Sequence, residues 1–307
     1  EFYLNPLQLS PAATGVFKGD MRATGLYRSQ WKNVPVAYET FSGAVEWKAF
    51  QRWNNHFSIG LLLQHDQAGD AGLSNLQIGT SLGVAHSLNE NNALSLGFGI
   101  AMLQRSFDIS GLKFKNQWGG DAFNPDLPTG ESFNRASALA PTLSASLLWH
   151  YRQNETRSQI DMAVGLAHLN QPLVSLGDFD ERLKPRISFF ANSIWQINSR
   201  HDLVFVAELQ QMAKSSECLF GAGIRRILTT GVANETNLQL LVLHRLGDAF
   251  IPAVQLERNN WTWALSYDWN VSRFEAATNG QGGIEIAVIW QKMPVPSLRT
   301  VKSCPVF

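Results

Sequence analysis

The sequence predicts an all-β protein: a transmembrane, antiparallel, up-and-down β-barrel of about 14 strands, with short periplasmic turns and long extracellular loops. Three observations lead to this prediction. Segment after segment alternates between large apolar and small polar residues, charged residues make up only 16% of the chain, and several odd-numbered strands are followed by long connections. An average globular domain has roughly 25% charged residues.

The clearest alternation lies at 261–272, which reads WTWALSYDWNVS. The odd positions carry large apolar and aromatic residues, and the even positions carry small or polar ones. Because a strand sends successive side chains to opposite faces, this segment has one aromatic face and one polar face. Three tryptophans on the apolar face suit a wall that faces lipid, with aromatic rings at the membrane interfaces.

The same period-two pattern predicts strands along the whole chain, each close to the ~9–11 residues that a tilted membrane strand needs. The predicted strands lie at 19–31, 36–49, 55–66, 74–88, 92–107, 137–153, 158–169, 184–197, 202–211, 217–228, 237–245, 249–258, 261–271 and 283–292.

The connections between these strands differ systematically in length. Most that follow even-numbered strands are short, whereas several that follow odd-numbered strands are long. The long ones are 67–73, 108–136, 170–183 and 272–282. Outer-membrane barrels have this asymmetry, and a soluble β-sandwich has no reason to place its long loops on one side.

The composition excludes several classes of protein. A formal net charge of zero gives no electrostatic basis for nucleic-acid binding. No apolar run reaches 18 residues, so a helical membrane span is excluded. Only Cys218 and Cys304 are present, either as one disulfide or as two separate thiols. No nucleotide, serine-hydrolase or HExxH motif occurs, so we expect neither an enzyme nor a bound cofactor or metal.

Two segments fall outside the predicted strands and define a three-part chain. Residues 1–18 form an N-terminal segment that either plugs the lumen or caps the periplasmic end. Residues 19–292 form the barrel, and residues 293–307 form a periplasmic tail that contains three prolines. The chain begins at Glu1 without methionine, as a mature form would after removal of a signal peptide, and as a trimmed chain also would.

Charged and polar residues on the strands are candidates for the lumen wall. A charge that faces lipid near the midplane costs roughly 2–4 kcal/mol, so these side chains are expected to point inward and pair, either bracing the wall or lining a substrate path. The set is Glu39, Asp161, Arg186, Glu208, Arg245, Asp268, Asn270 and Glu285.

The longest loop, 108–136, has an unusual aromatic content, with Phe114, Trp118 and Phe123. Such a loop either folds into the barrel mouth and binds a partner or packs on its own aromatic rings. The C-terminal residues Cys304, Pro305 and Phe307 are a second candidate for partner binding, because the tail lacks strand alternation yet ends in apolar residues.

Four short stretches stand out along the chain: NPLQLSPAATG at 5–15, YRSQW at 27–31, YDWNVS at 267–272 and the terminal CPVF. They resemble motifs of the PorP/SprF family of outer-membrane proteins associated with type IX secretion in Bacteroidetes. Segment 5–15 is similar to the family's opening, although Ser10 stands where Asn is usual. YRSQW matches the family's Arg-x-Gln-Trp, and YDWNVS matches its penultimate strand. CPVF resembles its terminal Cys-Pro-x-Phe, with valine where a basic residue is commoner. The matching positions are Asn5, Pro6, Pro11, Gly15, Arg28, Gln30, Trp31, Tyr267, Asp268 and Ser272.

This resemblance implies a barrel exported to the outer membrane, without enzymatic activity, that supports secretion or anchoring of cell-surface proteins. The implied partners are adhesin-like gliding proteins with a type B C-terminal signal domain, periplasmic components of the same machinery, and outer-membrane lipid. Another candidate is a channel for hydrophobic small molecules that resembles the 14-stranded fatty-acid transporters. It predicts a hydrophobic pocket under the N-terminal segment and a lateral opening. A soluble two-domain sandwich is the third.

Overall fold

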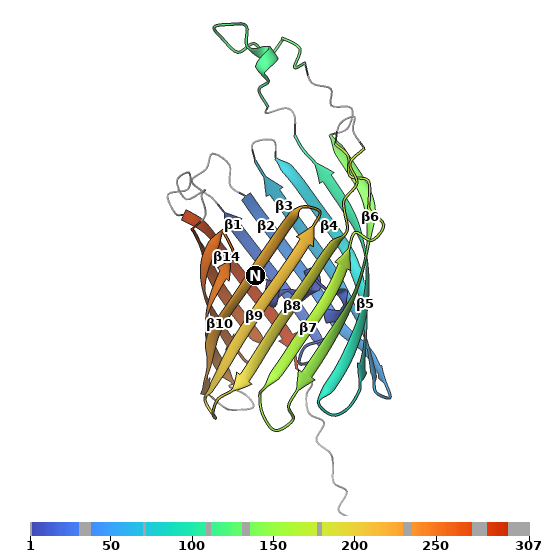
Figure 1. The fold of residues 1–307 in the computed structure, drawn as a ribbon, viewed down its shortest axis with the longest axis vertical. Helices are drawn as coiled ribbons and strands as arrows, with labels where there is room; N and C mark the ends of the chain where they lie inside the picture. Colours follow the sequence, from blue (N-terminus) through green and yellow to red (C-terminus); the bar gives the residue numbers. More distant parts are fainter. Residues whose placement is uncertain are drawn as a thin grey trace, which may run out of the picture.

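The computed structural model describes residues 2–30, 38–69, 72–108, 112–130, 136–176, 180–229, 235–271 and 281–293. Within them, fourteen strands form one closed antiparallel barrel, in which each strand pairs with its sequence neighbours and β1 pairs with β14 (Figure 1). The strands are β1 (Met21–Gln30), β2 (Tyr38–Arg52), β3 (Asn55–Ala68), β4 (Leu73–Ser87), β5 (Asn92–Ser106), β6 (Ser137–Arg152), β7 (Gln159–Ala167), β8 (Arg186–Gln196), β9 (His201–Met212), β10 (Ser215–Thr229), β11 (Thr236–Arg245), β12 (Ala249–Arg258), β13 (Trp261–Asn270) and β14 (Gln281–Lys292). The predicted fold class is confirmed.

The alternation of β13 sorts its side chains as the sequence indicates. Trp263 and Trp269 are exposed on the outer wall, whereas Ala264, Asp268 and Asn270 are buried inside. The other strands repeat this arrangement, because a closed sheet has only an outer and an inner face. No helix in the described part of the chain is both long and apolar enough to cross a membrane.

The two ends of the barrel differ in their connections. At one end, which we call the short-turn end, the turns at 53–54, 88–91 and 259–260 join strands tightly. The opposite long-loop end carries the connections 107–136 and 168–185. Two connections at this end, 213–214 and 246–248, are also short. Figure 1 shows the loop around η4 (Lys115–Gln117) rising above the rest of the long-loop end.

The N-terminal segment lies inside the lumen and packs against the inner wall. Three short 3-10 helices, η1 (Phe2–Leu4), η2 (Pro6–Gln8) and η3 (Pro11–Ala13), lie inside the barrel wall (Figure 1). Phe2 and Leu9 pack against inward-facing apolar residues of the strands, including Phe190 and Leu243. Leu4 packs on the other side of the lumen against β1, β13 and β14. We call residues 2–15 the plug.

Candidate functional site

The main chain of the plug is hydrogen-bonded to hydroxyl groups on the inner wall. Ser146 Oγ accepts a hydrogen bond from the Ala12 amide at 2.6 Å, and Ser95 Oγ donates to the Ala12 carbonyl at 2.7 Å. Ser188 Oγ donates to the Leu9 carbonyl at 2.9 Å. These bonds satisfy backbone groups that the short 3-10 turns leave open, and they fix the plug to β5, β6 and β8.

Glycines on the inner wall let the plug approach the strands closely. A Cβ on Gly97 would overlap the backbone of Pro11 and Ala12, and one on Gly165 would overlap the Leu9 carbonyl. The wall beside η3 is therefore shaped for this backbone.

The family-like residues of segment 5–15 hold the plug in place. Asn5 is fully buried and its amide donates to Ser42 Oγ at 2.9 Å. Pro6 and Pro11 are the first residues of η2 and η3. Proline suits this position, because the N–H group that it lacks would make no bond within the helix. Gly15 has φ +80°, and its amide donates to Glu46 Oε2 at 3.1 Å.

A second group of polar residues joins the first and last strands of the barrel. The buried carboxylate of Asp268 on β13 accepts hydrogen bonds at Oδ2 from Arg28 Nη2 at 2.6 Å, Gln30 Nε2 at 3.1 Å and Arg245 Nη1 at 2.9 Å. Arg28 Nε also lies 4.0 Å from Glu285 Oε2 on β14. The two sequence stretches that resemble the family, around Arg28 and around Asp268, thus meet across the closing seam.

The other predicted lumen residues divide into those that face inward and one that does not. Arg186 donates to the Gln8 carbonyl at 3.0 Å, Glu208 accepts from the Gln210 amide, and Asn270 is buried. The prediction for Glu39 is wrong. Its side chain lies on the outer face at the long-loop rim, where it accepts a hydrogen bond from Tyr27 Oη at 2.8 Å. Charges near the interface cost only ~0–1 kcal/mol, so the rim tolerates it.

A cavity of about 770 Å³ opens at the short-turn end below the plug. Its lining is strongly charged and includes Lys18, Arg22, Arg157 and Glu257. Burial lowers the pKa of the Lys18 ammonium, which lies outside the strands.

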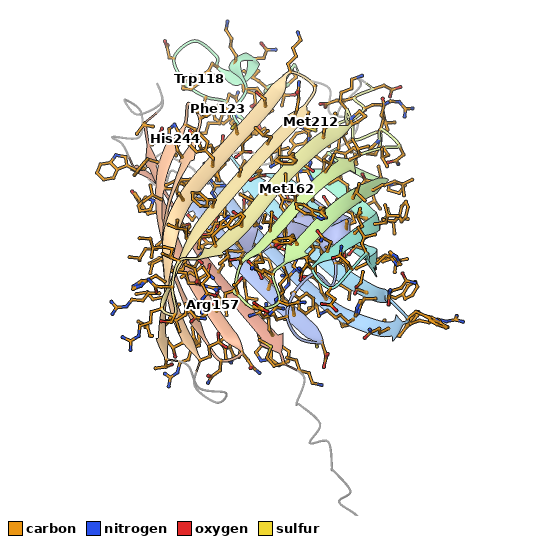
Figure 2. The ribbon with its side chains drawn as sticks, turned by 60° about the horizontal axis from the view of Figure 1, so that its bottom comes forward. Trp118, Phe123, Arg157, Met162, Met212 and His244 are labelled. Atoms are coloured by element: carbon orange, nitrogen blue, oxygen red, sulfur yellow. The ribbon has the colours of Figure 1, made fainter. Side chains whose placement is uncertain are left out.

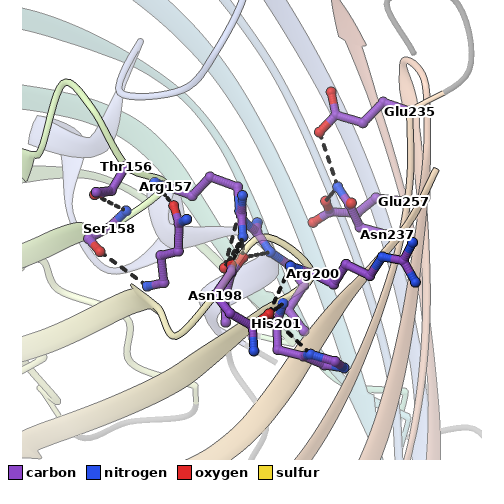
Figure 3. A network of polar contacts seen from close by, with 12 residues as sticks. Thr156, Arg157, Ser158, Asn198, Arg200, His201, Glu235, Asn237 and Glu257 are labelled. Carbon is purple, nitrogen blue, oxygen red and sulfur yellow. Dashed lines mark hydrogen bonds and ion pairs between the residues drawn. The ribbon is translucent and has the colours of Figure 1, made fainter. Parts of the chain in front are cut away.

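Ion pairs brace the wall of this cavity. Asp202 accepts from Arg157 Nη2 and Arg225 Nη2, both at 2.8 Å. Figure 3 shows Arg157 within this network and, further along the rim, Asn237 between Glu235 and Glu257. On the other side of the plug a cavity of about 50 Å³ shares no lining residue with the larger one.

The aromatic loop at the long-loop end is a small hairpin of its own. Trp118 and Phe123 form an antiparallel bridge with ring centroids 6.2 Å apart, and Phe114 caps η4 through its amide. The loop packs on its own aromatics, yet Trp118 stays 56% exposed at the outermost part of the protein (Figure 2). The remaining predicted site residues, Trp31, Ser272, Cys304, Pro305 and Phe307, lie outside the described residues.

Sequence reasoning missed the residues that hold the plug. Ser95, Ser146 and Ser188, with Gly97 and Gly165, sit at the small polar positions of the alternation. That pattern marks the lumen face but does not show what the face contacts. Across the described ranges no cluster of three or more His, Cys, Asp or Glu side chains is arranged to hold a metal ion.

Over residues 1–289 the sequence matches the family described as "Type IX secretion system membrane protein PorP/SprF". The chain belongs to this family. Among curated proteins none matches it.

Solved structures of outer-membrane barrels resemble this PorP/SprF-family chain in fold. The P. putida toluene transporter TodX has 10% identity, covers 94% of each chain and gives a TM-score of 0.51. A Pseudomonas aeruginosa FadL homologue has 9% identity, covers 92% of each chain and gives a TM-score of 0.48. The translocator domain of the autotransporter NalP from Neisseria meningitidis has 10% identity, covers 94% of this chain and 93% of its own, and gives a TM-score of 0.37. Family and fold together place the chain in the outer membrane.

Proposed function

We propose that this barrel is a non-enzymatic component of type IX secretion that supports the export or surface anchoring of large adhesin-type proteins by binding them at its long-loop end. The observation that carries the proposal is the plug. Its backbone is bonded to three strands, and its apolar side chains reach both sides of the lumen. A lumen filled in this way favours a binding scaffold over a conduit.

The exposed aromatic loop supplies a surface for such binding. Trp118 is a large, rigid side chain on the side away from the short turns, and exposed tryptophans are frequent energetic centres of protein interfaces. Loops carried on a rigid barrel are also the usual place for recognition.

Gentle detergent extraction of native membranes, followed by affinity capture of the tagged barrel, tests the proposal. A large surface protein should copurify with the wild-type barrel, and the double variant Trp118→Ala, Phe123→Ala should lose most of it. The matched control is Trp53→Ala, which removes a tryptophan that is 85% exposed at the short-turn end. Recovery of the bare barrel from wild-type membranes would contradict the proposal.

The tail supplies a second contact in this proposal, to periplasmic components of the machinery. Deletion of residues 296–307 should leave the barrel folded, as judged by heat-modifiable gel migration, and should impair secretion of the surface protein. Normal secretion by that variant would contradict a role of the tail in secretion.

The channel hypothesis receives less support from the site. It requires a hydrophobic pocket under the N-terminal segment, and the cavity there is lined by several cations and carboxylates. Uptake of a labelled fatty acid into liposomes that contain the barrel would favour the channel, and background uptake would favour the scaffold.

A further inference from the structure

Strand β7 stops well short of its neighbour β6. β6 is 16 residues long and β7 is 9, and the two pair only over residues 145–152 of β6. On its other side β6 is paired with β5 along its whole length, from Ser137 to Tyr151. Residues 137–144 therefore have a strand on one side only, and this edge lies in the long-loop half of the wall.

At every second residue of this edge, the backbone N–H and C=O groups point away from β5, into the gap beyond the end of β7. The Leu143 carbonyl accepts a bond from the Leu169 amide at 3.0 Å, and the Leu143 amide donates to Asn170 Oδ1 at 3.0 Å. Asn170 Nδ2 then donates to the Pro141 carbonyl at 2.7 Å. Because N–H and C=O directions alternate along a strand, Leu139 has both groups on this side as well.

The position of Pro141 agrees with that assignment. A proline inside a sheet is tolerated where its missing N–H would face an unpaired edge. The side chain of Asn170 takes the place of a neighbouring strand, because it bonds to the Leu143 amide and the Pro141 carbonyl. The next backbone groups along the edge, at Leu139, have no partner strand among the described elements.

A crevice of about 490 Å³ lies against this edge. It is lined by residues 137–141 of β6 and by the loop that follows β7, including Pro172 and Arg182. The loop is anchored elsewhere, because Val174 is fully buried against Leu103 and Ala140. The crevice is therefore part of a packed arrangement.

Two side chains give the crevice a chemical preference. Leu139 is 64% exposed and offers an apolar contact on the outer side. Arg182 Nη1 donates to the Gln171 carbonyl at 3.3 Å, and Arg182 forms no ion pair with the described residues. An extended segment that carries an acidic side chain complements both features.

We propose that the β6 edge at Ser137–Pro141 binds an extended segment of the secreted protein, which adds to the wall as a short extra strand. This inference rests on the proposed function and specifies its contact. An unpaired strand edge is a template for another chain, main-chain hydrogen bonds supply the affinity, and neighbouring strands lie ~4.8 Å apart. Since ~9–11 residues of a tilted strand cross a bilayer, the part of β6 that extends beyond the nine residues of β7 is accessible from outside.

The variants Leu139→Pro and Leu139→Ala distinguish the contribution of the main chain to binding from that of the side chain. The proline removes the N–H that faces the gap and leaves the β5–β6 bonds intact, because those bonds come from the even-numbered residues. The alanine keeps the N–H and removes the apolar contact. The probe is the purified C-terminal domain of the surface protein that copurifies with the wild-type barrel, and its affinity for barrel in nanodiscs is measured.

We expect Leu139→Pro to weaken binding by about tenfold, the equivalent of one good hydrogen bond, and Leu139→Ala to weaken it by no more than about threefold. Heat-modifiable migration verifies that both variants fold. Equal affinity of all three barrels would overturn the edge proposal and leave the proposed function standing. No binding to the wild type would overturn both.

A photo-crosslinking residue at position 139 gives an independent result. The control carries the same crosslinking residue at Leu203, on the outer face of β9. A crosslinked adduct with the domain from position 139, and none from position 203, supports the edge proposal. An adduct with lipid alone, which would make the crevice a lipid site, overturns it.

Discussion

At the scale of single residues, inward-facing charges connect motif positions that lie far apart in the sequence. Arg28 and Asp268 both match the family's motifs, and they form an ion pair inside the barrel. Asp268 is 2% exposed and accepts from two guanidinium groups and one amide, on β1 and β11. A buried carboxylate with several charge-assisted bonds is costly to alter, because its partners would keep their charges without it. We infer that this group stabilises barrel closure.

Asp268→Asn should destabilise the barrel by about 3 kcal/mol, because Arg28 and Arg245 would lose the charge between them. The measurement is the urea midpoint of unfolding in detergent, followed by tryptophan fluorescence. Glu39→Gln is the matched control, since Glu39 is exposed at the rim, and it should shift stability by less than about 0.5 kcal/mol. Equal midpoints for the two variants would show that Asp268 does not brace the seam.

His168 gives a prediction about pH. Burial, helped by the nearby Arg186 charge, lowers the pKa of His168 from 6.5 to about 4. Its neutral Nδ1 lies 2.9 Å from Thr142 Oγ1, next to the loop that lines the β6 crevice. Between these two pKa values the unfolded chain binds a proton that the folded chain does not. The folded state therefore loses stability from this residue as pH falls from 6.5 toward 4.

His168→Asn should flatten the pH dependence of unfolding between about pH 7 and about pH 5. Asparagine also tolerates the positive φ of 58° at this position. His201→Asn, on an exposed turn, is the control. If the wild type and His168→Asn have the same slope, the folded protein does not exclude the proton from His168.

At the scale of elements, the plug depends on the wall for its conformation. Three helices of three residues each are too short to persist alone, and the hydroxyl groups and glycines of β5, β6, β7 and β8 hold them. The plug and the inner wall are therefore a single packed unit, and a change on either side should loosen the other.

Gly97→Ala should release the plug, because its Cβ would overlap the backbone at Pro11 and Ala12. The readout is maleimide labelling of a cysteine placed at the fully buried Ser10, with both native cysteines replaced by serine. Labelling should be at least about tenfold faster than in the parent, since a local opening of ~1.4 kcal/mol suffices. Gly25→Ala is the control, because its Cβ meets nothing within 4 Å. Equal protection of all three proteins would mean that this wall does not hold the plug.

The elements also show what sequence could and could not predict. Period-two alternation is a local pattern that predicts where strands lie, so the predicted strand bounds agree with the observed ones within a few residues. The prediction for Glu39 is wrong because the cost of a charge that faces lipid depends on its depth in the membrane, and the local sequence does not show that depth. Two features depend on distant partners: the contact of Ser188 with Leu9, and the different lengths of β6 and β7. No local pattern contains either one.

At the scale of the whole molecule, the barrel combines a lipid-facing outer wall with a lumen divided by the plug. The cavities on the two sides of the plug have no lining residue in common. Large apolar residues cover the outer face around the barrel, and the polar chemistry is confined to the lumen and the two ends. Recognition of partners is then left to the ends, where the aromatic loop and the β6 edge lie.

The most direct test of a scaffold with a closed lumen is ion conductance in a planar lipid bilayer. Purified wild-type barrel should show no steady conductance, and a variant that lacks residues 2–15 but still migrates as a folded barrel should open stable pores. Steady wild-type conductance equal to that of the deletion variant would contradict the account and favour a conduit.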